Sequence, residues 1–155
     1  MKKKVCVGLF GTSGKSTWRR PFIEKLTEAG IDYFNPQVEE WTPACAEAEA
    51  QHLAQDEVLV YPILGETYGV GSLVETGFAV AQIVQADGKR HILLFIEPEV
   101  NAQLRQENPA QAKDSDRARK LALAHLKELS LPTVRSCSSL EDLLAQTLEV
   151  AKGLS

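Results

Sequence analysis

The sequence predicts a three-layer α/β fold, in which an open parallel five-stranded sheet lies between two layers of helices. Five short apolar segments alternate with segments of helical periodicity, a pattern typical of parallel sheets. The apolar segments are rich in β-branched residues, as strands buried on both faces require. The 155 residues fit about one domain of ordinary size, so residues 1–155 are expected to form a single domain. The flavodoxin-like (Rossmann-like) strand order 2-1-3-4-5 is the natural one for five strands.

The expected strands are 5–10, 31–34, 57–63, 91–96 and 133–137. The expected helices are 18–29, 43–55, 72–86, 101–108, 114–129 and 139–153. Gly30 is expected just past the end of the first helix. Thr42 is expected to cap the second, with Pro43 at its first position. The polar stretch 106–116 is expected to be a loop around Pro109. The charged residues of helix 114–129 are expected at the surface, and the last helix at the sheet edge or against a partner subunit.

Composition excludes several classes of protein. The chain carries 17 Lys+Arg and 21 Asp+Glu, a formal net charge of −4, which gives no reason to expect polymeric nucleic acid or an anionic membrane as partner. No apolar stretch approaches the roughly 18 residues of a membrane span. The basic start, Met1 to Lys4, is expected to be a solvated lead-in to the first strand rather than a signal peptide. The three cysteines and three histidines are scattered, so no metal site is expected, and the cytoplasm is the default compartment.

Aromatic residues and glycines mark the region where a ligand is expected. No aromatic residue follows Phe95. In parallel sheets, ligands bind at the carboxyl ends of the strands, here after Phe10, Phe34 and Ile63. Phe10 and Phe34 are expected in the core, with Phe10 also bordering the ligand. Trp18, Trp41 and Tyr68 could either pack in the core or stack on a ligand.

The segment Gly8 to Thr17 nearly matches a phosphate-binding P-loop. The first glycine stands one residue too early, and no magnesium-binding Asp is evident, so P-loop phosphotransfer is the least favoured reading. Backbone N–H groups together with Lys15 or Arg19 could still hold an anion or a sugar hydroxyl. An ordinary strand-to-helix turn explains the loop equally well.

A glycine-rich loop, Gly65 to Gly71, precedes an apolar helix that carries Glu75. A carboxylate in the first turn of this helix would face the ligand crevice. The spacing Ser72-x-x-Glu75 also fits a capping box, in which Glu75 accepts the Ser72 N–H. Spacing alone leaves both roles open.

Four stretches resemble the nucleoside 2-deoxyribosyltransferase superfamily, especially its shorter deoxyribosyltransferase-like branch. They are Gly11 with Ser16-Thr17-Trp18-Arg19, Gly30 to Pro36 with Trp41, Asp56 to Ile63, and Gly71 to Ala79. The Glu75 stretch also resembles the glycine-rich motif of phosphoribohydrolases that activate cytokinins. Two positions depart from the transferase pattern: Gly69 stands where the family has an Asp, and Ala48 stands where it has a base-contacting Asp, with Glu47 and Glu49 beside it.

The resemblance implies that Glu75 is a catalytic nucleophile and that the chain forms a homo-oligomer. It implies a small nucleoside or nucleotide as substrate, and no cofactor. The substrate-binding candidates are Phe10, Gly11, Ser13, Trp18, Arg19, Asn35, Trp41, Tyr68, Gly71 and Ser72. The expected function is cleavage or transfer at an N-glycosidic bond through a covalent glycosyl-enzyme. Glu66, Tyr68 and Asp56 are the candidates for protonating the leaving base. The alternative function is a non-catalytic nucleotide-binding or sensing module of the same fold.

Overall fold

The computed structural model describes residues 4–155, so Met1 to Lys3 of the basic lead-in lie outside the described residues. The strands are β1 (Cys6–Leu9), β2 (Asp32–Phe34), β3 (Val58–Ile63), β4 (His91–Ile96) and β5 (Val134–Ser136). The helices are α1 (Arg19–Glu28), α2 (Pro43–Gln55), α3 (Val70–Gln85), α4 (Ala102–Glu107), α5 (Pro109–Leu129) and α6 (Leu140–Leu154). The strands form one parallel sheet of order β2-β1-β3-β4-β5. The predicted fold class and strand order are therefore confirmed.

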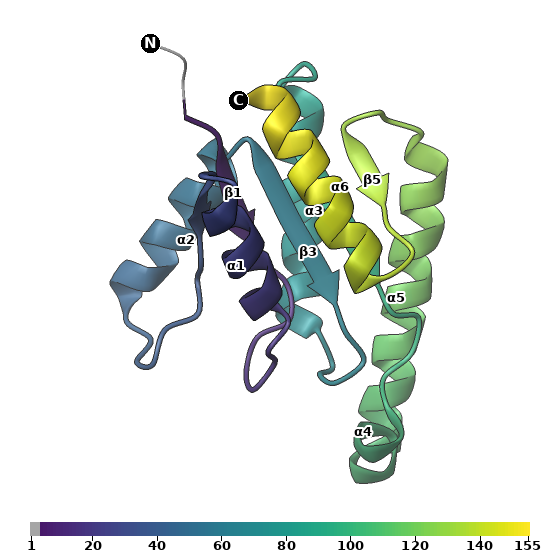
Figure 1. Cartoon of the computed structure of the whole chain (residues 1–155). Helices are drawn as coiled ribbons and strands as arrows, with labels where there is room; N and C mark the ends of the chain where they lie inside the picture. Colours follow the sequence, from purple (N-terminus) through teal and green to yellow (C-terminus); the bar gives the residue numbers. More distant parts are fainter. Residues whose placement is uncertain (1–3) are drawn as a thin grey trace.

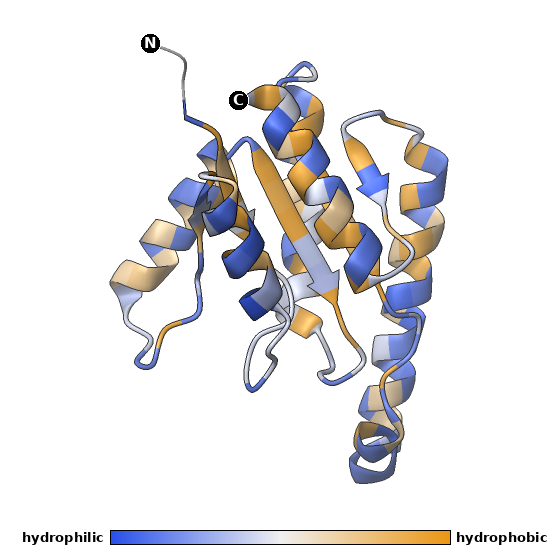
Figure 2. Ribbon diagram, viewed as in Figure 1, coloured by the Kyte–Doolittle hydropathy of each residue, from blue (hydrophilic) through white to orange (hydrophobic). Residues whose placement is uncertain are grey.

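Helices cover both faces of the sheet (Figure 1). One apolar cluster packs α1 and α6 against side chains such as Val7 and Leu9 of β1. The opposite cluster packs α3 and α5 against Leu59, Tyr61 and Ile63 of β3. Every residue of β3 is buried, and Figure 2 shows most of this strand as hydrophobic. The centre of the sheet is thus buried on both faces, as its continuous apolar strands required, whereas the edge strand β2 is largely exposed.

Several local predictions are confirmed. Gly30 adopts a φ of +66° directly after the α1 cap, which is the left-handed conformation that glycine supplies at a helix end. Thr42 caps α2, with Pro43 at the first helical position. Ser138 and Ser139 both fit the cap position of the last helix in the sequence, and Ser139 is the one that caps α6, through a hydrogen bond from the Asp142 N–H.

Other predictions were wrong. The stretch 106–116 is not a loop, because Asn108 caps α5 and Pro109 occupies its first turn, where proline's missing N–H costs nothing. The last helix lies against β3 and β4 near the middle of the sheet rather than at its edge. On α5, Asp116 and Arg119 are buried rather than on the surface. Within residues 4–155, every helix is too short or too polar to cross a bilayer.

Candidate active site

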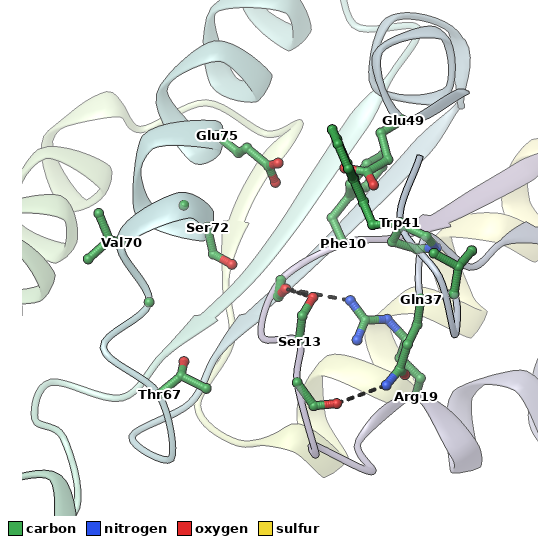
Figure 3. Close-up of a pocket in the computed structure, with 16 residues that line it drawn as sticks. Phe10, Ser13, Arg19, Gln37, Trp41, Glu49, Thr67, Val70, Ser72 and Glu75 are labelled. Atoms are coloured by element: carbon green, nitrogen blue, oxygen red, sulfur yellow. Dashed lines mark hydrogen bonds between the residues drawn. The ribbon is translucent and has the colours of Figure 1, made fainter. Parts of the chain in front are cut away.

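A pocket of about 540 Å³ opens at the carboxyl end of β1, between the segment after β2, helix α2 and the start of α3. Figure 3 shows its walls. Eight residues of the predicted site line it: Phe10, Gly11, Ser13, Arg19, Trp41, Gly71, Ser72 and Glu75. The sheet therefore brings together side chains from three separate loops at the edge where parallel sheets bind ligands.

Three predicted substrate-binding residues lie outside this pocket. Trp18 is buried beside Phe22, and its Nε1 donates to the Thr12 carbonyl at 2.8 Å. Asn35 accepts a hydrogen bond from the Gln37 N–H at 3.1 Å. The Tyr68 hydroxyl turns away toward α4 and donates to the Leu104 carbonyl at 3.0 Å. Their polar groups are thus engaged with the protein rather than with the pocket.

The residues expected to protonate a leaving base also lie outside the pocket. Glu66 is exposed and accepts a hydrogen bond from the Ser16 hydroxyl. Asp56 is buried at the end of α2, where His52 Nδ1 lies 2.9 Å from its Oδ1. With Tyr68 directed toward α4, none of the three candidates faces the pocket.

The loop after β1 is tied to β3 rather than curled around an anion. The Thr12 N–H donates to the Pro62 carbonyl at 2.9 Å, and the Thr12 hydroxyl accepts the Leu64 N–H at 2.8 Å. Gly11 has a φ of +91°, and a Cβ there would lie 2.5 Å from the Pro62 carbonyl oxygen. Only glycine allows this close crossing of two backbones. The arrangement gives no support to P-loop chemistry, and Lys15 is exposed outside the pocket.

Arg19 places a buried positive charge beside the pocket. Its Nε donates to the Leu9 carbonyl at 2.9 Å and its Nη1 to the Thr12 carbonyl at 2.8 Å. The guanidinium carbon lies 4.5 Å from the centre of the Trp18 ring. Burial lowers the pKa of Arg19 to about 10, which still leaves the side chain charged at neutral pH. The carbonyls fix its position, and its charge acts on the carboxylates of the pocket.

Glu75 extends into the pocket from α3. The helix begins at Val70, after Gly69 caps it in the left-handed conformation at a φ of +67°. Ser72 therefore stands inside the helix, and the predicted capping box is wrong. Glu75 lies in the second turn, where the backbone needs no side-chain partner, so its half-buried carboxyl is available to a ligand.

A second carboxyl, Glu49 of α2, faces the pocket opposite Glu75 (Figure 3). Burial and the Glu49 charge raise the pKa of Glu75, against the opposing effect of Tyr61 and Arg19. Burial also raises the pKa of Glu49, and the Arg19 charge opposes that rise. Two carboxyls with raised pKa values in one pocket are typical of sites that exchange protons.

Tyr61 of β3 lies close to the Glu75 carboxyl. Its ring stacks on Phe10 with centroids 5.4 Å apart. Its buried hydroxyl affects the pKa of Glu75 but makes no hydrogen bond of ordinary geometry with any residue among 4–155. The hydroxyl is thus a buried donor close to the candidate nucleophile.

At the sequence level Glu49 was named only as a neighbour of Ala48, and neither Glu49 nor Tyr61 was proposed as a site residue, although signals for both existed. Glu49 stands one helical turn before Leu53, which packs on the core, whereas Glu47 is exposed. Tyr61 follows Leu59 by two residues in β3, which places both on the face covered by α3. Helical phase and strand alternation would have indicated both.

The sequence over residues 5–93 matches the family model described as nucleoside 2-deoxyribosyltransferase like. The chain belongs to this family. The match covers β1 through the first part of β4 and thus all residues that line the pocket. No curated protein matches the sequence significantly.

Solved structures share the fold of this deoxyribosyltransferase-like protein. The TIR domains of the RPS4–RRS1 heterodimer superpose with a TM-score of 0.55 at 10% identity, covering 98% of both chains. A conserved protein from Enterococcus faecalis V583 gives 0.54 at 16% identity, covering 96% of this chain and 99% of the other. The TIR domains of the activated Roq1 resistosome, which recognises the effector XopQ, give 0.52 at 11% identity, covering 95% and 99%. At such low identities the likeness concerns the fold alone.

The deoxyribosyltransferase-like chain departs from the transferase pattern at Gly69, and its packing explains the departure. A Cβ at Gly69 would lie 2.9 Å from Ile63 Cγ2 and 3.0 Å from Arg119 Nη2. Arg119 is fully buried and fills the space beneath the loop. An Asp at position 69 would require this guanidinium to move.

Arg119 of α5 makes hydrogen bonds along the loop between β3 and α3. Its Nη1 donates to the carbonyls of Ile63 and Glu97, each at 3.0 Å. Its Nη2 donates to the carbonyls of Leu64 at 3.0 Å and Thr67 at 2.8 Å. The loop that leads to Glu75 is therefore positioned by a residue of α5, beyond the segment that the family model matches.

Proposed function

We propose that the protein cleaves or transfers an N-glycosidic bond of a nucleoside or nucleotide, with Glu75 as nucleophile. The observation that carries the proposal is the half-buried Glu75 carboxyl, which lies in a family-matched pocket opposite a second carboxyl, Glu49. The pocket volume of about 540 Å³ lies within the usual range of small-molecule sites. Aromatic surface from Phe10 and Trp41 is available to a base or a sugar face.

In the first step, a Glu75 carboxylate oxygen attacks the anomeric carbon and the bond from that carbon to the base nitrogen breaks. The base leaves with the bonding electron pair and takes up a proton. In the second step, water or another base attacks the same carbon from the opposite face, the bond from that carbon to Glu75 breaks, and the proton of the attacking group passes to the Glu49 carboxylate. Two inversions give retention of configuration.

The two carboxyls suit opposite roles in this reaction. Burial raises the pKa of both carboxyls and the Arg19 charge opposes both rises, so the pair can hold one proton between its two members. In the proposed reaction Glu75 is the ionised member that attacks, and Glu49 is the protonated member that supplies the proton that the leaving base needs. The pair resembles the general arrangement in which two neighbouring carboxyls divide acid and nucleophile roles.

A second copy of the chain is proposed to cover the apolar side of α3 next to the pocket. Val74 and Phe78 are 60% and 66% exposed, and Phe78 lines a cleft together with Glu75 and Glu49. Large apolar side chains exposed together typically mark an interface. Sedimentation of the wild type and of Phe78→Ser tests this, because the variant should shift toward the monomer.

The test of the reaction is release of free base from ribo- and deoxynucleosides and their 5′-monophosphates, followed by chromatography. Glu75→Gln should fold and lose base release by roughly a thousandfold or more, since it removes the nucleophile. Glu47→Gln, an exposed change on α2, is the control and should keep wild-type turnover. Undiminished turnover in Glu75→Gln would contradict the proposal.

A non-catalytic binding module is the second candidate, favoured by one observation. Gly69 stands where the transferase pattern has an Asp, and a Cβ there would come within 3.0 Å of Ile63 and Arg119. Thermal-shift measurements with the same nucleosides and monophosphates separate the two functions. Binding without base release by the wild type over long incubation would favour the module over the enzyme.

A further inference from the structure

A second cluster of reactive side chains lies away from the pocket, between β1 and the end of α2. It consists of Cys6, His52 and Asp56. The Cys6 sulfur, one His52 ring nitrogen and one Asp56 oxygen all lie within 4.8 Å of one another. His52 Nδ1 lies 2.9 Å from Asp56 Oδ1 and 3.1 Å from Oδ2. Three different ligand atoms therefore converge on one point of the structure.

Neighbouring groups hold the His52 ring and the backbone around Asp56 in place. The Phe34 ring stacks on the His52 ring, with centroids 3.8 Å apart and planes within 6°. Arg90 donates from Nε to the Asp56 carbonyl at 2.7 Å and from Nη2 to the Leu53 carbonyl at 2.6 Å. Outer contacts of this kind orient the ligands in metal sites.

Gly8 makes room for the Asp56 carboxylate. A Cβ at Gly8 would lie 2.8 Å from Asp56 Oδ2 and 2.5 Å from Phe10 Cε2. The absence of a side chain at Gly8 thus lets the carboxylate reach the face of β1 on which Cys6 lies. The cluster is closed on the sheet side and open on the side of His52, whose side chain is 36% exposed.

The charge around Cys6 is negative. The carboxylates of Asp56, Glu57 and Asp32 all lie close enough to act on its thiol. A divalent cation would offset this negative charge and stabilise the thiolate.

We propose that Cys6, His52 and Asp56 bind a divalent transition-metal ion of the zinc class, with the remaining coordination position open to water. Sulfur, imidazole and carboxylate ligands together favour Zn²⁺ over the harder Mg²⁺ and Ca²⁺. On binding, the Cys6 S–H bond breaks, a sulfur–metal bond forms and the proton passes to solvent. No sequence motif reveals this site, because only His52 and Asp56 are close in sequence, at i and i+4.

The site would fasten α2 to the sheet. None of the residues described in α2 is buried, so few side chains hold this helix against β1. Glu49 precedes His52 by three residues, about one helical turn. Metal binding at the end of α2 would therefore also steady the position of Glu49 in the pocket.

Titration of the chelator-treated, full-length protein with Co²⁺ tests the proposal, followed by competition with Zn²⁺. We expect one ion per chain, a thiolate-to-cobalt charge-transfer absorption, and release of about one proton per ion in weak buffer. Cys6→Ser should abolish the absorption, whereas Cys45→Ser, which changes the half-buried cysteine in the first turn of α2, should retain it. Zn²⁺ should raise the melting temperature of the wild type.

His52→Gln keeps the thiol and serves if Cys6→Ser fails to fold. It should weaken Co²⁺ binding by about tenfold or more. A charge-transfer absorption that survives Cys6→Ser, wild-type affinity in His52→Gln, or no bound Co²⁺ at all would overturn the proposal. These readouts do not depend on base release, so failure of the metal site and failure of the proposed function can be told apart.

Discussion

Replacing Arg119 by Met tests whether α5 holds the loop that leads to Glu75. Met has a similar length and an apolar stem, so the substitution removes the guanidinium while filling much of its space. The Ile63 carbonyl keeps a partner, because it also accepts the Glu97 N–H at 3.0 Å. The carbonyls of Leu64, Thr67 and Glu97 lose the hydrogen bonds that Arg119 makes.

The size of the effect follows from the burial of these three carbonyls. An unsatisfied buried polar group costs about 1–3 kcal/mol. Leu64 is buried, whereas Thr67 and Glu97 are half-buried and can be reached by water. Arg119→Met should therefore lower the free energy of unfolding by about 2–5 kcal/mol.

Urea denaturation measures this loss. With an m value of about 1–3 kcal/mol/M, the midpoint should fall by about 1 M or more. Arg117→Met on the exposed side of the same helix is the control and should change stability by about 0.5 kcal/mol or less. A loss below about 1 kcal/mol for Arg119→Met would refute the reasoning that these hydrogen bonds hold the loop.

Three further predictions follow from single positions. Gly69→Ala should destabilise more than Gly30→Ala. Both glycines have φ near +66°, where an alanine costs about 1–2 kcal/mol. Only at Gly69 would the new Cβ also meet other atoms, at an added cost of about 1–3 kcal/mol. Equal losses in the free energy of unfolding, measured in urea, would contradict this. Glu75→Gln should melt above wild type at pH 8, with a smaller difference at pH 5. Because the pKa of Glu75 is raised in the folded state, the wild type gains stability at acid pH and loses it as pH rises. A melting temperature of Glu75→Gln below that of the wild type at pH 8 would contradict the conclusion that burial disfavours the Glu75 carboxylate. Wild-type base release should rise with pH as Glu75 ionises and fall as Glu49 loses its proton. Glu49→Gln should remove the alkaline fall, so a pH–rate profile that keeps it would exclude Glu49 as the acid.

The fold was predictable because it rests on local patterns. Apolar runs such as Val58–Ile63 alternate with amphipathic helices, and this alternation leaves few strand orders for a parallel sheet. The ends of helices were harder to predict, since the same residue type occurs in loops, at cap positions and in first helical turns. Pro109 fits a loop and a first helical turn equally well, and Ser72 fits a cap only if the helix begins there.

The candidate site was predictable in part. Gly11 lies in the loop after β1, and Arg19 and Glu75 lie near the start of the helices that follow β1 and β3, so their place at one edge of the sheet follows from topology. Glu49 enters the pocket from a helix whose rotation depends on how Leu53 packs. Arg119 acts on a loop about fifty residues away along the chain, and no local pattern reports such a contact.

The two walls of the pocket differ in how well they tolerate substitutions, because α2 is only weakly attached to the rest of the fold. Glu75 stands on α3, whose preceding loop is tied down by Arg119 and whose inner side is buried in the core. Glu49 and Trp41 belong to a helix and a lead-in segment without a buried side chain, where substitutions cost little stability. Apart from Glu49, which the proposed reaction uses, residues of the α2 wall such as Trp41 can therefore be exchanged with little effect on the position of Glu75. Under the proposed function, Trp41 is thus the position at which to alter substrate preference.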